Sequence, residues 1–181
     1  EDLVRGEGSG AAIIFWGEDR VKRTLSHNDL RDQVSRLQQA LRDMDVGVGD
    51  RVAGFLPNLP ETVIAMLAAT SLGAVWSSCS PDFGIQGVLD RFGQIEPKVL
   101  FVADGYFYGG KAFDCLGKVK GIMAELPSVE QLVVVPYVAE APKLDGLPDA
   151  VTWGDYLGSY QAGEIEYTRL PFNAPLYIMY S

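Results

Sequence analysis

Cysteine and histidine are scarce in this chain of 181 residues. Its two cysteines, Cys79 and Cys115, both lie in apolar segments, and its single histidine is His27. One histidine and two distant cysteines make a zinc site improbable, so we expect two reduced thiols packed in the core. His27 falls in the first turn of a predicted surface helix, where a solvated capping position is a better interpretation than a catalytic role.

Segments that would direct the chain into or across a membrane are also missing. The longest apolar stretch, residues 63–76, is too short and too polar at its edges to span a bilayer. No signal peptide opens the sequence, and no asparagine stands in a glycosylation motif. We therefore expect a cytoplasmic protein with no membrane partner.

Positive charge is in deficit. The chain has 15 Lys and Arg against 24 Asp and Glu, a formal net charge of −9. Such a surface disfavours nucleic acid as a partner, although a local basic pocket for a phosphate is still allowed. A hydrophobic content of 48% with 22% charged residues indicates a folded globular chain. Its length suits one domain, or one domain and part of another.

Apolar runs alternate with helical patterns along most of the chain. Four short runs, near residues 51, 74, 98 and 131, are apolar on both faces and are separated by helical periods. This alternation predicts an α/β fold with a doubly wound, mainly parallel sheet and helices on both faces. We expect a flexible leader at residues 1–10, an α/β subdomain at 11–138, and a connector with a final strand at 139–181.

Local signals predict several boundaries. Residues 17–20 separate two β-prone runs and predict a hairpin. Ser26, followed three residues later by Asp29, predicts a helix N-cap, and Gly47 is expected to end that helix. The next helix, residues 61–72, is apolar almost all round, so we expect further protein to cover its outer face.

Doubly wound sheets bind their ligands at the carboxyl ends of the strands. The cluster after the second strand contains three serines, a thiol and an acid, but helix capping by Ser80 and Asp82 is the simpler interpretation. The predicted strand ends are residues 57–58, 77–82, 104–106 and Ser181.

Residues 104–113, DGYFYGGKAF, form a second candidate. Gly109 and Gly110 at a helix start would free backbone N–H groups to face an anion, and Lys111 adds a positive charge. The aromatic residues at 106–108 suit stacking on a base or on a pantetheine-like chain. A plain turn is the simpler interpretation of the two glycines.

Common catalytic motifs are absent from the sequence. There is no G-x-x-x-x-G-K-[ST] loop, no G-x-G-x-x-G fingerprint and no G-x-S-x-G elbow. The missing fingerprint argues against a dinucleotide-dependent oxidoreductase, which the βαβ pattern alone would suggest. The residues by themselves thus predict an α/β domain with a ligand edge, no catalytic residue and no metal ligand.

A family resemblance adds to this interpretation. Residues 47–84 (GVGDRVAGFLPNLPETVIAMLAATSLGAVWSSCSPDFG), residues 90–98 (DRFGQIEPK) and residues 104–111 resemble the amino-terminal part of the adenylate-forming acyl-CoA synthetases of the acetoacetyl type. The resemblance covers essentially everything from Ala11 to Ser181. It implies a ligase that uses ATP, Mg²⁺ and CoA and acts on a short acid, expected to be acetoacetate.

The resemblance has two further implications. A strand at residues 176–180 would lead into a phosphate-binding loop whose first residue is Ser181, so we expect an amino-terminal fragment that is inactive alone. In related synthetases, the segment matching Gly109, Gly110 and Lys111 contacts the 3′-phosphate end of CoA. These three are the predicted cofactor-binding residues.

One alternative stays open at this point. The chain would then be a stand-alone, non-catalytic α/β module that binds a nucleotide or a partner, with the apolar helix at residues 61–72 as an interface. For an isolated amino-terminal fragment, we also expect self-association through apolar surface left exposed.

Overall fold

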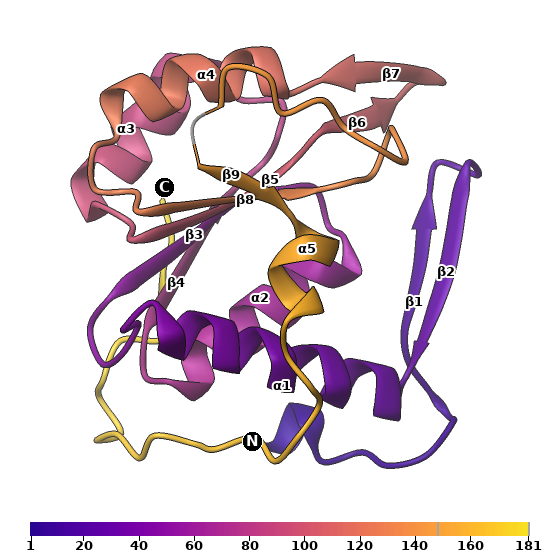
Figure 1. Cartoon of the computed structure of the whole chain (residues 1–181), viewed down its shortest axis with the longest axis vertical. Helices are drawn as coiled ribbons and strands as arrows, with labels where there is room; N and C mark the ends of the chain where they lie inside the picture. The colour runs from indigo at the N-terminus through magenta and orange to yellow at the C-terminus, as the bar shows by residue number, and fades with distance from the viewer. Residues whose placement is uncertain (148, 181) are drawn as a thin grey trace.

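A parallel sheet of six strands forms the centre of the molecule (Figure 1). The computed structural model describes residues 1–147 and 149–180. The strand order is β10-β4-β3-β5-β8-β9, and every neighbouring pair is parallel, which confirms the predicted fold class. The strands are β3 (Arg51–Phe55), β4 (Val75–Cys79), β5 (Val99–Ala103), β8 (Gln131–Val135), β9 (Ala150–Thr152) and β10 (Tyr177–Ile178).

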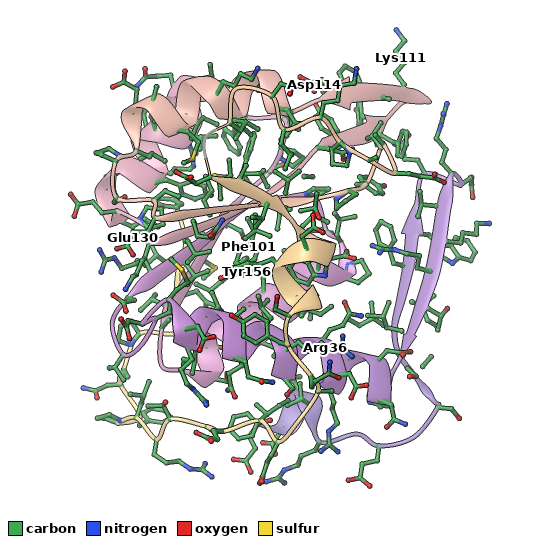
Figure 2. All side chains as sticks on the ribbon, viewed as in Figure 1. Arg36, Phe101, Lys111, Asp114, Glu130 and Tyr156 are labelled. Atoms are coloured by element: carbon green, nitrogen blue, oxygen red, sulfur yellow. The ribbon has the colours of Figure 1, made fainter. Side chains whose placement is uncertain are left out.

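Helices cover both faces of this sheet (Figure 1). One face packs against α1 (His27–Asp43), α2 (Pro60–Ser71) and α5 (Trp153–Gly158), and the other against α3 (Ile85–Ile95) and α4 (Leu116–Glu125). Alternate residues of each strand face opposite layers: on β5, Phe101 packs on the α1 side and Leu100 on the α3 side. Figure 2 shows Phe101 in the interior, and its ring packs edge-on against that of Trp153 of α5 with centroids 5.8 Å apart. Strands buried on both faces explain the continuous apolar runs in the sequence.

Two antiparallel hairpins stand beside the sheet. The hairpin of β1 (Ala11–Gly17) and β2 (Val21–Ser26) was predicted; that of β6 (Gly105–Tyr108) and β7 (Lys111–Asp114) was not. Gly109 and Gly110, with φ of 57° and 77°, form the two-residue turn of the second hairpin. The prediction that they start a helix is therefore wrong, because α4 begins only at Leu116.

The predicted N-cap of α1 is confirmed. The Asp29 amide donates to Ser26 Oγ at 3.1 Å, and the Ser26 amide donates to the Asp29 carboxylate at 2.9 Å. The helix ends at Asp43, before the predicted Gly47. Asp45 adopts a left-handed φ of 53°. This conformation ends the helical path two residues before Gly47, where the sequence predicted the end.

Helix α2 receives part of its cover from this chain itself. It packs on α1, and the buried Gln38 of α1 donates from its side-chain amide to Ser71 Oγ and to the Glu166 carbonyl, both at 2.6 Å. The Glu166 amide donates back to the Gln38 side-chain oxygen at 3.1 Å. The connector is thereby held along α1 and α2, while Val63 on the outer face of α2 stays 36% exposed.

The two ends of the chain carry more regular structure than the sequence indicated. Residues 1–10 include a short 3-10 helix, Asp2–Val4, whose Val4 is buried in the α1 layer. Residues 139–180 include β9, an unpredicted edge strand, as well as α5 and β10. The proposed domain boundaries remain a prediction, and Ser181 lies outside the described residues.

Across residues 1–147 and 149–180, none of the helices combines the length and the apolar character needed to cross a membrane.

Candidate functional site

A cleft of about 720 Å³ opens at the carboxyl edge of the sheet. Residues that follow β3 and β4 form one side of it, and the β6–β7 hairpin forms the other. The chain leaves β3 into α2 on one face of the sheet and leaves β4 into α3 on the opposite face. Neighbouring strands that diverge in this way create the crevice in which doubly wound folds bind ligands. The cleft therefore lies at the edge that the sequence predicted.

Aromatic side chains form one wall of the cleft. Tyr106 stacks on Phe113 across the hairpin, with ring centroids 5.1 Å apart and planes 14° apart. Phe107 packs edge-on against Tyr137 at 5.2 Å, and Tyr108 is exposed at the rim. Burial raises the pKa of both Tyr106 and Tyr137, so their hydroxyls stay neutral at physiological pH. This wall suits contact with a flat or apolar part of a ligand.

The segment after β4 supplies the polar side of the cleft. Ser78, Ser80 and Asp82 are exposed there. The Phe83 amide donates to the Ser80 carbonyl at 3.2 Å, and α3 is capped by Gly84 without a side-chain hydrogen bond. The prediction that Ser80 and Asp82 cap the helix is therefore wrong, because this turn sets both residues back from the helix start. Their polar groups are left facing the cleft.

Both cysteines are buried free thiols, as predicted. Burial raises the pKa of each thiol to about 12; nearby Arg91 opposes this at Cys79 and Lys118 opposes it at Cys115. A thiol of that pKa carries almost no thiolate at neutral pH and is a poor nucleophile. Cys79 lines the cleft as an apolar packing group.

Lys118 of α4 holds the loop after β4, which lines the cleft. Its Nζ donates to the carbonyl of Pro81 at 2.9 Å and to that of Phe83 at 3.3 Å. The same ammonium lies 5.9 Å from the ring centroids of Phe55 and Tyr106. Lys118 thus ties the loop after β4 to the wall opposite, and its charge is already engaged within the chain.

His27 lies outside the cleft. Its imidazole packs against the backbone of Gly6, and its buried Nδ1 has no hydrogen-bond partner. The prediction of a solvated position is wrong, because the leader folds back over the start of α1. Nothing in this environment supports a catalytic role.

The three predicted cofactor-binding residues lie together at the tip of the β6–β7 hairpin, beyond the aromatic wall. The amides of Gly109 and Gly110 donate to the two carboxylate oxygens of Glu18 at 3.3 and 3.2 Å. The turn therefore presents a pair of donors that already hold an anion. Lys111 extends away from the molecule into solvent (Figure 2).

Metal ligands do not gather in the part of the chain that the structure describes. Among residues 1–147 and 149–180, no group of three or more His, Cys, Asp or Glu side chains could hold a metal ion.

Comparison with known proteins agrees with this architecture. The family model described as "AMP-binding enzyme" matches residues 4–181. The chain belongs to this family. Over its full length it is 52% identical to the acetoacetyl-coenzyme A synthetase of Rhizobium meliloti (strain 1021) and 46% identical to the acetoacetyl-CoA synthetase of Mus musculus. It spans 28% of the length of each of these relatives.

A solved structure extends the likeness to three dimensions. The acetoacetyl-CoA synthetase from Streptomyces lividans superposes on 94% of the chain with a TM-score of 0.85 at 40% identity, and the match covers 26% of that protein. A more distant relative, the malonamoyl-CoA synthetase vrtB of Penicillium aethiopicum, is 35% identical over 94% of the chain and 24% of its own length. The fold of this chain is therefore shared with much longer family members.

One contact in this member of the family was not foreseen from its sequence. The Arg20 guanidinium of the β1–β2 turn donates to the carbonyl of Gly110 and lies 5.3 Å from the ring centroid of Phe107. Together with Glu18, it joins two turns that are 90 residues apart in the sequence. The one sequence feature that could have indicated this contact is the charged turn at residues 17–20. Charged turns are usually solvated, so the feature did not predict a partner.

Proposed function

We propose that this chain is the amino-terminal part of an ATP-dependent ligase that joins acetoacetate to CoA. The observation that carries the proposal is the 52% identity to the acetoacetyl-coenzyme A synthetase of Rhizobium meliloti across the whole chain. The alignment that gives this identity spans 185 residues and covers the whole of this chain. In this proposal the protein is cytoplasmic and uses ATP with Mg²⁺.

The proposed reaction has two steps. The carboxylate of acetoacetate attacks the α-phosphorus of ATP, which gives an acyl-adenylate and releases pyrophosphate. The thiol of CoA then attacks the acyl carbon, and AMP leaves with the electron pair of the broken C–O bond. Such chemistry depends mainly on positioning and on neutralising phosphate charge.

The part of this chain in the proposal is to bind CoA. The aromatic wall at residues 106–108 suits stacking with the adenine base or contact with the pantetheine chain. Gly109 and Gly110 offer two amides to the 3′-phosphate, and Lys111 adds a cation to the same tip. Support comes from the carboxylate of Glu18, which those amides already hold. No catalytic step is assigned to any residue of this chain.

The test is a ligase assay on the longer protein that contains this chain. We expect acetoacetate, ATP and CoA to yield acetoacetyl-CoA and AMP in equal amounts, detected by mass spectrometry and by AMP release. Malonamate and acetate serve as competing acids, the first because of the relative from Penicillium aethiopicum. A preference for either competing acid would contradict acetoacetate as the substrate. Failure to form an acyl-CoA from any short acid would contradict the ligase activity itself.

The 181-residue chain is the matched negative control. We expect it to catalyse no acetoacetate-dependent exchange of pyrophosphate into ATP, because none of its described residues is assigned to adenylation. Exchange by this chain alone would contradict the division of labour proposed here. Tight CoA binding by the chain, combined with a longer protein that lacks ligase activity, would instead favour the non-catalytic binding module.

A further inference from the structure

The tips of the two hairpins are joined by a carboxylate held between two amides. Glu18 Oε1 accepts from the Gly109 amide at 3.3 Å, and Oε2 accepts from the Gly110 amide at 3.2 Å. The φ angles of 57° and 77° at these glycines place both N–H groups on one side of the turn. Figure 1 shows the β1–β2 and β6–β7 tips at the same edge of the molecule.

A positive charge is fixed at the glycine turn that holds this carboxylate. Arg20 donates to the Gly110 carbonyl and rests over Phe107 at 5.3 Å, so its guanidinium is fixed beside the turn. Lys111 follows the glycine pair on β7, and Lys22 pairs with Asp19 at 3.6 Å on the other hairpin. Removal of the Glu18 side chain would leave two free amides beside the Arg20 guanidinium, while Lys111 on the same hairpin extends into solvent. That combination is the chemistry that binds a phosphate monoester.

We propose that Glu18 is a built-in competitor for a phosphate monoester at the Gly109–Gly110 turn, and that Arg20 is a ligand of that phosphate. The identity of the phosphate as the 3′-phosphate of CoA rests on the proposed function. Glu18 and the phosphate cannot hold the same two amides, so binding requires the Glu18 side chain to swing away.

Competition of this kind has a defined effect on affinity. The apparent affinity for the phosphate falls in proportion to the fraction of molecules in which Glu18 leaves the amides free. It also links ligand binding to the hairpin contact, because two hydrogen bonds between the tips are exchanged for two to the ligand. Phosphate binding therefore loosens the β1–β2 hairpin from β6–β7, and Arg20 becomes the group that holds the tips together.

The test is an NMR titration of the ¹⁵N-labelled 181-residue chain with adenosine 3′-phosphate, followed at the Gly109 and Gly110 amides. We expect Glu18→Gln to bind roughly fivefold or more tightly than wild type, because the freed amides no longer face a competing carboxylate. The matched control is Asp19→Asn, which removes the same charge from the same turn but touches neither glycine. We expect it to bind like wild type, and Arg20→Gln in the Glu18→Gln background to bind more weakly.

Several outcomes would overturn the inference. Equal tightening by Glu18→Gln and Asp19→Asn would reduce the effect to general electrostatics. Equal affinities for adenosine and adenosine 3′-phosphate would show that the phosphate is not recognised. Chemical-shift changes that spare both glycines would place the ligand elsewhere. The proposed function fails separately: a longer protein that forms no acyl-CoA refutes the ligase, while tighter binding by Glu18→Gln still supports the competition.

Discussion

The buried carboxylate of Asp104 holds the backbone beside the cleft in place. Asp104 Oδ1 accepts from the amides of Tyr137 and Val138 at 2.8 and 2.9 Å, and Oδ2 accepts from the Ala139 amide at 2.7 Å. Its side chain is nearly excluded from solvent, so these charge-assisted hydrogen bonds replace its hydration. Tyr137, fixed in this way, forms part of the aromatic wall. The residue that follows β5 thus positions part of the cleft wall, although Asp104 itself does not line the cleft.

The substitution Asp104→Asn tests this role. The amide has one acceptor oxygen, and its NH₂ group would face a backbone N–H, so we expect the free energy of unfolding to fall by about 2 kcal/mol. Urea denaturation followed by circular dichroism measures the change. Asp32→Asn, at an exposed position on α1, is the control and should change stability by less than about 0.5 kcal/mol. Equal effects of the two substitutions would contradict a structural role for Asp104.

Within the central sheet, β3 and β4 depend on one glycine. Gly54 lies in β3, where a glycine is normally unfavourable, and the ring of Trp76 from β4 occupies the space beside it. A Cβ added at Gly54 would lie 2.8 Å from a ring carbon of Trp76. The indole is buried and packs on Phe101 with ring centroids 6.5 Å apart, so it has no room to move aside. The absence of a side chain at Gly54 of β3 leaves room for the large Trp76 side chain of β4.

The substitution Gly54→Ala should therefore destabilise the protein by about 1–3 kcal/mol through overpacking against Trp76. Gly93→Ala, in the interior of α3 with open space around its Cα, is the same chemical change and should stabilise by up to about 1 kcal/mol. Thermal unfolding of the two variants measures both signs. Stabilisation by Gly54→Ala would show that Trp76 yields easily and that the glycine is dispensable.

The molecule as a whole exposes apolar side chains at one edge of its sheet. Strand β10 ends the strand order and pairs only with β4 among the described strands, which leaves its other edge open. Phe172, Leu176, Tyr177 and Met179 are all exposed along this segment. An open, apolar edge strand is a ready site for pairing with another chain.

This edge leads us to expect self-association of the 181-residue chain. Light scattering should show an apparent mass that rises with concentration, because burial of the exposed apolar groups at β10 offsets the entropy of association. Met179→Lys should reduce the effect by placing charge on the edge. Ile14→Lys, at an exposed position on the β1–β2 hairpin, is the control and should leave it unchanged. A constant monomer mass over a wide concentration range would contradict the expectation.

Part of the site could be predicted from local patterns. The carboxyl-edge cleft followed from the alternation of strands and helices, because crossovers in a parallel sheet bring the ends of all strands to one edge. The aromatic wall at residues 106–108 was also expected to meet a ligand. The capping function assigned to Ser80 and Asp82 was wrong, since a turn after β4 and a solvated cap have the same residue preferences.

The sequence by itself determined the elements whose energetics are local. The Ser26 cap, the first hairpin, the buried strands and the apolar stripes of the helices depend on residues only a few positions apart. Tertiary structure alone decided which groups meet across the chain: Glu18 and Arg20 reach Gly109 and Gly110, and Gln38 holds the backbone at Glu166. The physical reason is that such contacts gain their energy from groups brought together by the packed sheet and helices. The same side chains in isolated turns would be solvated.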